Sequence, residues 1–448
     1  MLSAFSNTLK IPELRNRIFL TLGLIFACRL VAIVPTPGVD AAALQRVIQD
    51  IESRVGGGFL GLVDMFSGGA LSNCAVGALG IMPYISASII MQLMTAVVPG
   101  LERLAREGES GRAKLTQYAR YLTVGLCLVQ AYFMAAALER PEALGINAQV
   151  VSHPGLAFRL MTVLTMTTGT LLVMWLGEQI TRNGIGNGIS LIITVSIVSR
   201  LPRAIYAATA MFKQVEGVAQ FNTFHLVGII AMLFLVVAGT IALTQGQRKI
   251  PIQYAKRVVG RKVYGGQNTY MPLRVNYSGV MPIIFGQAIL MFPSTILRRI
   301  PFEFTRTLGD MLSMDSSLYL VLYGLMILFF SYFWVATQFN PIQIADDLKK
   351  YGGYVPGIRP GRATAEFLDM SMTRITLAGA AFLTVIAVIP TIMSRQFNIP
   401  WIVASFFGGT SQLIVVGVML DTMRQVESHL LMRHYDGFLK KGKLRGRR

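Results

Sequence analysis

Side chains that commonly carry out catalysis are few in this sequence, and none has a catalytic spacing. The four histidines form no His-Glu-x-x-His pair, and the chain has no Gly-x-Ser-x-Gly elbow and no Gly-x-x-x-x-Gly-Lys phosphate loop. The three cysteines, Cys28, Cys74 and Cys127, lie within or beside apolar stretches and match no disulfide framework or metal site. We therefore expect no enzyme activity, no cofactor and no metal ion.

Arg29 is the charged residue with the most unusual position, because it lies inside an apolar stretch. An arginine within a membrane faces the interior of a helix bundle or water, either as a structural partner or as part of a functional site. Its charge also argues that this stretch is not the apolar core of a cleavable signal peptide. The elements that must position it are membrane helices.

The composition predicts one polytopic membrane domain. Of the 448 residues, 53% are hydrophobic and only 14% are charged, whereas a soluble domain is roughly a quarter charged. Apolar stretches of about 20 residues are long enough to cross the hydrocarbon layer. Ten such stretches are found at about 18–35, 76–98, 118–138, 156–176, 186–201, 225–243, 277–296, 317–338, 374–393 and 402–421. We interpret them as the ten transmembrane helices of an all-α polytopic membrane protein.

Residues 56–94 combine a segment unsuited to lipid with a plausible membrane span. The first part, residues 56–75, is rich in glycine and also contains Asp64 and Asn73. Non-helical backbone at membrane depth is tolerated only where protein or a water-filled cavity surrounds it. The second part continues from Gly80 as an apolar stretch. The sequence therefore predicts a cavity that holds a small mobile element.

A short motif occurs in both halves of the chain. Gly80-Ile-Met-Pro83 in the second apolar stretch is similar to Gly279-Val-Met-Pro282 in the seventh. These stretches are the second members of two sets of five. Because five is odd, the two sets would lie inverted in the membrane, and inverted repeats place a functional path at their interface. We predict an N-terminal half at 1–200, a C-terminal half at 201–424 and a basic tail at 425–448.

The basic residues predict the topology. Most of the 41 Lys and Arg residues lie before the first stretch, after the last one and in alternate connections. This excess predicts that both termini are cytoplasmic. Two connections on that side, 245–275 and 339–374, are too long to be turns, and long loops are often functional. Their charge suits either contact with anionic lipids or docking of an acidic or polyanionic partner.

Several stretches are specific to one protein family. They are PTPGVD at 35–40, FSGGAL at 66–71, ALGIMPYISASIIMQL at 78–93, RNGIGNGIS at 182–190, GQRKIPIQYAKR at 246–257, NPIQIADDLKKYGGYVPGIRPG at 340–361 and FGGTSQLIVVGVMLD at 407–421. Through them the chain resembles the SecY family, which forms the channel of the bacterial protein-conducting translocon. The resemblance runs from IPELRNRI, near the first residues, to the region of Tyr435.

The resemblance implies a central pore controlled by a plug, a ring and a lateral gate. A ring of bulky apolar side chains dewets when closed, and it accommodates almost any polypeptide because apolar contact is non-directional. The gate would release hydrophobic segments sideways into lipid. The implied residues are Phe59, Leu60, Leu62, Val63, Asp64, Phe66 and Leu71 for the plug, Ile81, Ile85, Ile189, Ile193, Ile284 and Ile414 for the pore ring, and Ile90, Ile289 and Phe292 for the lateral gate.

The resemblance also implies partners and a location in the bacterial cytoplasmic membrane. In the family the two long loops engage the SecA motor ATPase or the ribosome, whose RNA phosphates suit basic side chains. SecE and SecG are the implied membrane subunits, and signal sequences and nascent polypeptides are the implied substrates. The implied docking residues are Arg248, Lys249, Lys256, Arg257 and Arg359.

Three residues depart from the family pattern, and two other classes of protein stay open. The expected tightness of the closed channel is affected by these three residues, which are Gln287 after Gly286, Asp64 in the plug and Gln412 near Ile414. A coupled solute carrier usually buries carboxylates or broken-helix carbonyls as ion sites, and acidic residues are nearly absent from the ten stretches. An intramembrane enzyme needs a nucleophile or a metal pair at one depth, and we find none.

Overall fold

The computed structural model divides the chain into two compact units, Met1–Ala207 together with Val418–Arg448, and Ala208–Gly417. The predicted halves at 1–200 and 201–424 and the tail at 425–448 stay a prediction. The structure describes residues 11–40, 43–44, 64, 67–139, 150–151, 153–212, 223–254, 257–259, 262–264, 268–286, 289–290, 297, 303–312, 316–397, 399–407 and 409–441.

The first unit is built from helices. They are α2 (Pro12–Val31), α5 (Met82–Val97), α6 (Pro99–Arg106), α7 (Glu109–Glu139), α8 (Leu156–Asn183), α9 (Gly188–Val198) and α10 (Leu201–Met211), the last of which ends in the second unit.

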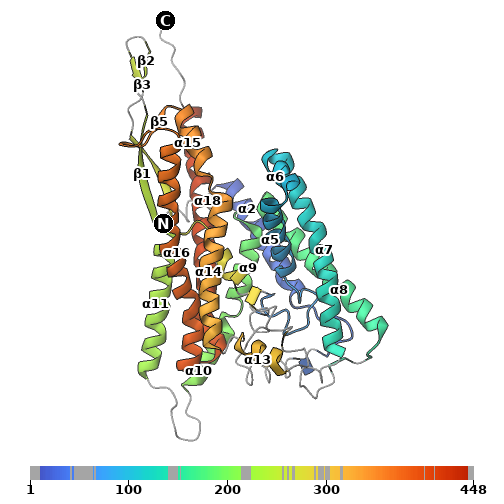
Figure 1. Cartoon of the computed structure of the whole chain (residues 1–448). Helices are drawn as coiled ribbons and strands as arrows, with labels where there is room; N and C mark the ends of the chain where they lie inside the picture. The colour runs from blue at the N-terminus through green and yellow to red at the C-terminus, as the bar shows by residue number, and fades with distance from the viewer. Residues whose placement is uncertain are drawn as a thin grey trace. The chain divides into compact units, whose positions relative to one another are not determined.

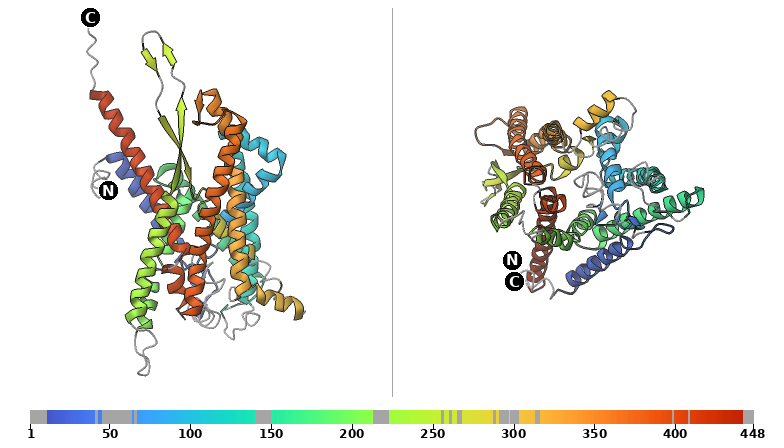
Figure 2. Two further views of the ribbon diagram at one scale, coloured as in Figure 1. Left: turned by 60° about the vertical axis from the view of Figure 1, so that its left-hand side comes forward. Right: turned by 90° about the horizontal axis from the view of Figure 1, so that it is seen from below.

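Helices α7 and α8 lie side by side and antiparallel, as both ribbon views show (Figures 1 and 2). Ion pairs join them near both ends. Arg120 of α7 donates from Nε and Nη2 to the two carboxylate oxygens of Glu178 at 2.8 Å each. At the opposite end, Arg159 Nε of α8 donates to Glu139 Oε2 at 2.6 Å. The Arg120–Glu178 pair is bidentate, a geometry that fixes orientation as well as distance, so together with the pair at the other end it sets the register of the two helices.

The core of the first unit includes the end of the glycine-rich segment. Leu71 and Cys74 are buried in one cluster with Ala131 of α7 and with Phe158 and Met166 of α8. Small residues allow close approach: a Cβ on Gly169 of α8 would overlap the carbonyl oxygen of Val76. Apolar burial and close backbone packing therefore hold this segment against α7 and α8.

The second unit contains helices and a small sheet. The helices are α11 (Thr223–Gln245), α13 (Glu303–Met311), α14 (Ser317–Gln338), α15 (Pro341–Lys350), α16 (Arg362–Gln396), α17 (Trp401–Phe407) and α18 (Thr410–Lys441), which continues into the first unit. A buried cluster joins α11, α14, α16 and the beginning of α18 through Val236, Ile327, Leu383 and Leu413.

Strands connect the two long loops that the sequence predicts to be cytoplasmic. Strands β1 (Gln247–Tyr254), β4 (Asn268–Arg274) and β5 (Gly353–Tyr354) form a sheet in the order β4-β1-β5. Both pairs are antiparallel, with Gln247 opposite Arg274 and Gln253 opposite Tyr354. Strands β2 (Arg257–Val259) and β3 (Lys262–Tyr264) form a second pair. The sequence analysis predicts loops here; the structure joins them through one sheet.

The fold class, an all-α polytopic membrane protein, is confirmed. Seven described helices are long and apolar enough to cross a membrane, or eight if α5 and α6, which meet at a bend of 103°, form one broken span. The described part of the predicted stretch 277–296 is helical at 281–286 and 289–290. The predicted total of ten transmembrane helices stays a prediction.

The repeated Gly-x-Met-Pro motif has the same local conformation in both places. Gly80 and Gly279 have φ of 57° and 63°, in the left-handed region that favours glycine. A helix begins at Met82 in the first copy and at Met281 in the second, so each proline falls in the first turn, where its missing N–H costs nothing. The repeat is therefore real at the level of backbone conformation, while inversion of the two halves stays a prediction.

We predict that Gly169→Ala destabilises the protein whereas Gly125→Ala does not. Both glycines lie inside long helices, where alanine favours the helix by roughly 1 kcal/mol. A Cβ at Gly169 meets the Val76 backbone, while a Cβ at Gly125 meets nothing within 4 Å. Forced overpacking costs about 1–3 kcal/mol. Thermal unfolding of the two purified variants measures the difference; equal melting temperatures would contradict the packing described.

Candidate functional site

The described part of the glycine-rich segment, Asp64 and Ser67–Ala75, is a compact, mostly buried set of turns. Its backbone is satisfied locally: Gly69 N donates to Asp64 O at 3.1 Å and Ala75 N to Ala70 O at 2.8 Å. Ala70 and Ala75 have no exposed surface. Protein surrounds this non-helical backbone, which is one of the two environments that the sequence predicts for it.

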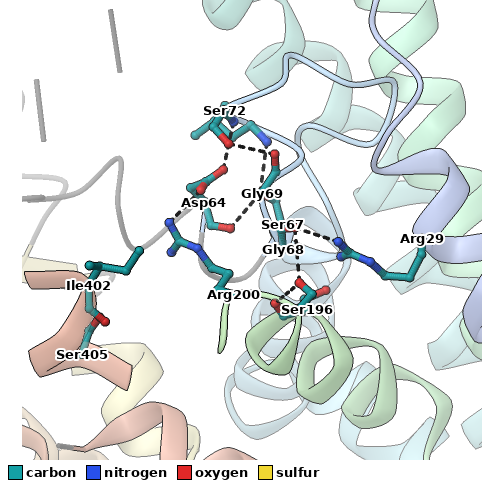
Figure 3. A network of polar contacts seen from close by, with 12 residues as sticks. Arg29, Asp64, Ser67, Gly68, Gly69, Ser72, Ser196, Arg200, Ile402 and Ser405 are labelled. Carbon is teal, nitrogen blue, oxygen red and sulfur yellow. Dashed lines mark hydrogen bonds and ion pairs between the residues drawn. The ribbon is translucent and has the colours of Figure 1, made fainter. Parts of the chain in front are cut away.

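Arg29 of α2 binds this segment. Its Nη2 donates to the carbonyl oxygen of Gly68 at 3.0 Å (Figure 3). Ser199 Oγ donates to the same oxygen at 3.5 Å. Gly68 has φ of 69°, and a Cβ there would overlap Arg29 Nη1 and lie 2.9 Å from Ser196 Cβ. A larger residue at position 68 would therefore displace the arginine or the segment. The intramembrane arginine is a partner of the glycine-rich segment, inside the bundle of the first unit.

A second arginine binds the same segment through a buried ion pair. Asp64 Oδ2 lies 2.8 Å from Arg200 Nη2, and only 2% and 10% of the two side chains are exposed (Figure 3). The other carboxylate oxygen, Oδ1, accepts a hydrogen bond from Ser72 N at 2.9 Å. Asp64 thus stabilises the turn of its own segment and also joins it to the end of α9.

The far end of the segment is joined to the residues that follow α2. Thr36 N donates to Cys74 O at 2.8 Å, and Val76 N donates to Val34 O at 2.8 Å. A small cavity of about 20 Å³ lies nearby, lined by Arg29, Ser67, Ile81 and Ser196 among others. This is space for about one water molecule. The sequence predicts a cavity around the segment, and within the first unit the structure contains this small one.

The predicted pore-ring residues of the first unit lie in α5, α9 and the turn before α5. Ile81 is the N-cap residue of α5 and is 1% exposed, Ile85 and Ile193 are buried, and Ile189 is half-buried beside Gly177 of α8. In the second unit, Ile284 is half-buried and Ile414 is buried. The convergence of all six isoleucines stays a prediction.

The other predicted site residues are placed as follows. Ile90 and Ile289, assigned to the lateral gate, are exposed. Gln412 donates from Nε2 to Phe406 O at 3.0 Å, so its polar group is bonded within the second unit. Leu71 is buried. The predicted residues Phe59, Leu60, Leu62, Val63, Phe66, Lys256, Gln287 and Phe292 lie outside the described residues.

The predicted docking residues lie on and beside the sheet. Arg248 and Lys249 are exposed on β1, and Arg359 is exposed in the connection between β5 and α16. Arg257 belongs to β2. Tyr354 of β5 donates from its hydroxyl to Gln253 Oε1 of β1 at 3.2 Å. Residues from two loops far apart in the sequence are thereby brought onto one connected structure.

Among the described residues, no group of three or more His, Cys, Asp or Glu side chains is placed to hold a metal ion. The site therefore consists of a buried polar segment, two arginines that bind it and apolar helices around it. Such a site is suited to holding a segment in place.

Comparison with known proteins connects this architecture to one family. Residues 75–423 match the SecY family. A protein translocase subunit SecY of Streptomyces griseus is 44% identical over 452 residues, which cover 98% of this chain and 100% of the relative. The chain belongs to the SecY family. The corresponding Thermotoga maritima protein is 42% identical over 454 residues, covering 100% of both chains.

Two solved structures share the fold. The first is described as showing that the plug domain of the SecY protein stabilises the closed state of the translocation channel and maintains a membrane seal. Its TM-score is 0.56, with 17% identity over 92% of this chain and 91% of the other. The other is Sec61 in the canine ribosome-channel complex from the endoplasmic reticulum, with a TM-score of 0.57, 17% identity and the same coverage.

Arg200 is the site residue that sequence reasoning missed. The signal for it was available, because the predicted topology places the glycine-rich segment and the connection after the fifth stretch on the same side of the membrane. Two opposite charges at the edges of apolar segments on one side are candidates for pairing, since a buried charge needs a partner. Asp64 was identified as a plug residue and as a departure from the family pattern, but without a partner for its charge.

We predict that Gly68→Ala destabilises the protein more than Gly69→Ala. Both positions have positive φ, so each alanine costs about 1–2 kcal/mol in backbone strain. Only the Cβ at position 68 also meets Arg29 and Ser196; at position 69 the nearest atom, Ser72 Oγ, is 3.9 Å away. Thermal unfolding in detergent measures both variants. An equal loss of stability would show that the close approach around Gly68 contributes nothing.

Proposed function

We propose that this SecY-family chain acts by holding its glycine-rich segment as the plug of a channel that conducts polypeptides. The chain is a protein translocase subunit by family, and one solved SecY structure with this fold is described as having a plug domain that stabilises the closed state. The observation that carries the proposal is the seating of Asp64 and Ser67–Ala75 inside a helical unit by Arg29 and Arg200. Besides the apolar burial of Leu71 and Cys74, the segment is bound by a few polar contacts, which water can replace when the segment leaves.

The substrates are unfolded secretory polypeptides and hydrophobic membrane segments. Support comes from the six isoleucines at motif positions, since apolar side chains contact any polypeptide without directional bonds. Ile90 and Ile289 would line the lateral gate. Release there is governed by the hydrophobicity of the moving segment, at roughly 25 cal/mol per Å² of apolar surface, so the channel sorts chains without chemistry and acts as no enzyme.

The exposed basic residues around the sheet dock the partner that supplies energy. A canine relative of this fold is found in a ribosome-channel complex. Arg248, Lys249 and Arg359 are exposed and offer donors to phosphates or carboxylates, which supports binding of the ribosome or of the SecA ATPase. We further propose SecE and SecG as membrane subunits, contacts with anionic lipids, the bacterial cytoplasmic membrane as the location, and cytoplasmic termini.

We predict that a secretory polypeptide stalled during transport crosslinks to photoreactive residues placed at positions 85 and 284. Both positions belong to the proposed ring, so the polypeptide must pass them. Position 128 is the matched control, because Leu128 of α7 is exposed and is not one of the proposed ring residues. Mass spectrometry of the products measures the crosslinks. Crosslinks at position 128 but none at 85 or 284 would overturn the assignment of the ring.

We predict that Arg359→Glu lowers polypeptide transport driven by SecA or by ribosomes roughly tenfold, which corresponds to about 1.4 kcal/mol. The charge reversal repels an acidic or phosphate-bearing partner. Lys114→Glu is the control, since Lys114 is exposed, makes the same charge change and lies near the beginning of α7 in another predicted cytoplasmic connection. Transport into membrane vesicles is the measurement. Equal losses in both variants would point to overall charge instead of a docking site.

A further inference from the structure

The ion pair between Asp64 and Arg200 has features that packing alone does not require. The two charges are 2.8 Å apart and almost fully withdrawn from solvent. Replacing such a buried pair by apolar residues is often neutral or stabilising, whereas removing one partner is strongly destabilising. A buried pair is therefore a poor source of stability, and its best-attested uses are in selecting one state over another.

The pair joins two parts of the chain that are otherwise held by different contacts. Asp64 belongs to the glycine-rich segment, where its second oxygen accepts from Ser72 N. Arg200 follows Ser199, the C-cap residue of α9, and precedes α10, which begins at Leu201. Its backbone N–H donates to Ile197 O at 3.1 Å, so the residue continues the last turn of α9. The guanidinium thus extends from a fixed helix end to the segment.

The end of α9 holds the segment at two points. Arg200 binds the Asp64 side chain, and the neighbouring Ser199 donates to the Gly68 carbonyl, where Arg29 of α2 also donates. Movement of the segment away from α9 would break the two contacts from Arg200 and Ser199. In that event the carboxylate and the guanidinium would each regain water, which offsets part of the lost attraction. The net cost of releasing the segment is therefore smaller than the attraction between the two charges alone.

We propose that Asp64 and Arg200 form a latch that sets how firmly the glycine-rich segment is seated, and hence how readily the channel opens. This inference rests on the proposed function for its consequence, since the seated segment corresponds to the closed channel. The latch adds to the free energy that an arriving polypeptide must supply, because a ligand shifts a two-state equilibrium only by its differential affinity for the two states. Arg200 is thereby a residue that sets the threshold for substrates.

The test measures release of the segment directly. A thiol is introduced by Ser72→Cys in a full-length protein whose native cysteines are replaced, and its labelling by a membrane-impermeant maleimide is followed in membranes. Ser72 is 5% exposed, and its link to Asp64 uses only the backbone N–H, so this change leaves the latch intact. We expect Asp64→Asn and Arg200→Gln each to raise the labelling rate roughly tenfold or more, because each leaves one buried charge without its partner.

Three controls make the result specific. Arg203→Gln removes an exposed positive charge close by on α10. At the same maleimide concentration its labelling rate should stay within about twofold of that of the parent, since exposed charges contribute little to stability. Arg200→Lys keeps the positive charge, so its labelling rate should be closer to that of the parent than to that of Arg200→Gln. A parallel protein that retains only Cys127, which has no exposed surface, reports misfolding: a misfolded variant labels there, whereas a released segment does not.

The outcomes separate this proposal from the proposed function. Labelling within about twofold of the parent in both Asp64→Asn and Arg200→Gln, in proteins that still transport polypeptides, overturns the latch. Faster labelling at position 72 with Cys127 still protected supports it. A third outcome is faster labelling in Asp64→Asn and Arg200→Gln when neither the parent nor any variant transports a polypeptide. The latch then stands as a property of the segment, and the proposed channel function is wrong. Equal labelling increases in Arg203→Gln and Arg200→Gln would also overturn the latch.

Discussion

Withdrawing an ionised side chain from water costs several kcal/mol, and this cost is offset only by hydrogen bonds or an opposite charge in direct contact with the buried group. In the first unit two arginines meet this requirement at one place. Arg29 donates to the carbonyl of Gly68, and Arg200 pairs with Asp64. The glycine-rich segment can satisfy them because its turns present a free carbonyl and a carboxylate. The ends of α2 and α9 are thereby tied to a backbone that is neither helix nor strand.

The most apolar helices were the most predictable elements. The predicted stretch 317–338 coincides with α14, and 225–243 lies within α11. Both are uninterrupted apolar runs, and Ser316 supplies an N-cap to the first. Helices α7 and α16 extend well beyond their predicted stretches, because polar residues continue a helix after it leaves the apolar layer. Hydropathy detects the layer, and it does not detect the end of the helix.

The sheet and the ion pair show two different limits of prediction from the sequence. Strand β1 alternates around buried Ile250 and Ile252, a period-two pattern that the sequence contains but from which no strand was predicted. The partner of Asp64 was not visible in any local pattern, since Arg200 lies far along the chain. Arg29 needed only its position in an apolar stretch to be identified as a residue facing the bundle interior. Pairing between distant segments depends on tertiary packing, which topology restricts but does not specify.

The two arginine contacts differ in what they require of their partners. Arg29 binds a main-chain carbonyl, so the contact does not depend on the nearby side chains of the segment. It does require glycine at position 68, because a Cβ there would overlap the Arg29 side chain. Arg200 binds a side chain, and the loss of either charge leaves the other buried alone. Over evolutionary time the first contact should appear as two invariant positions. The second should appear as covariation, with positions 64 and 200 carrying opposite charges together or both uncharged.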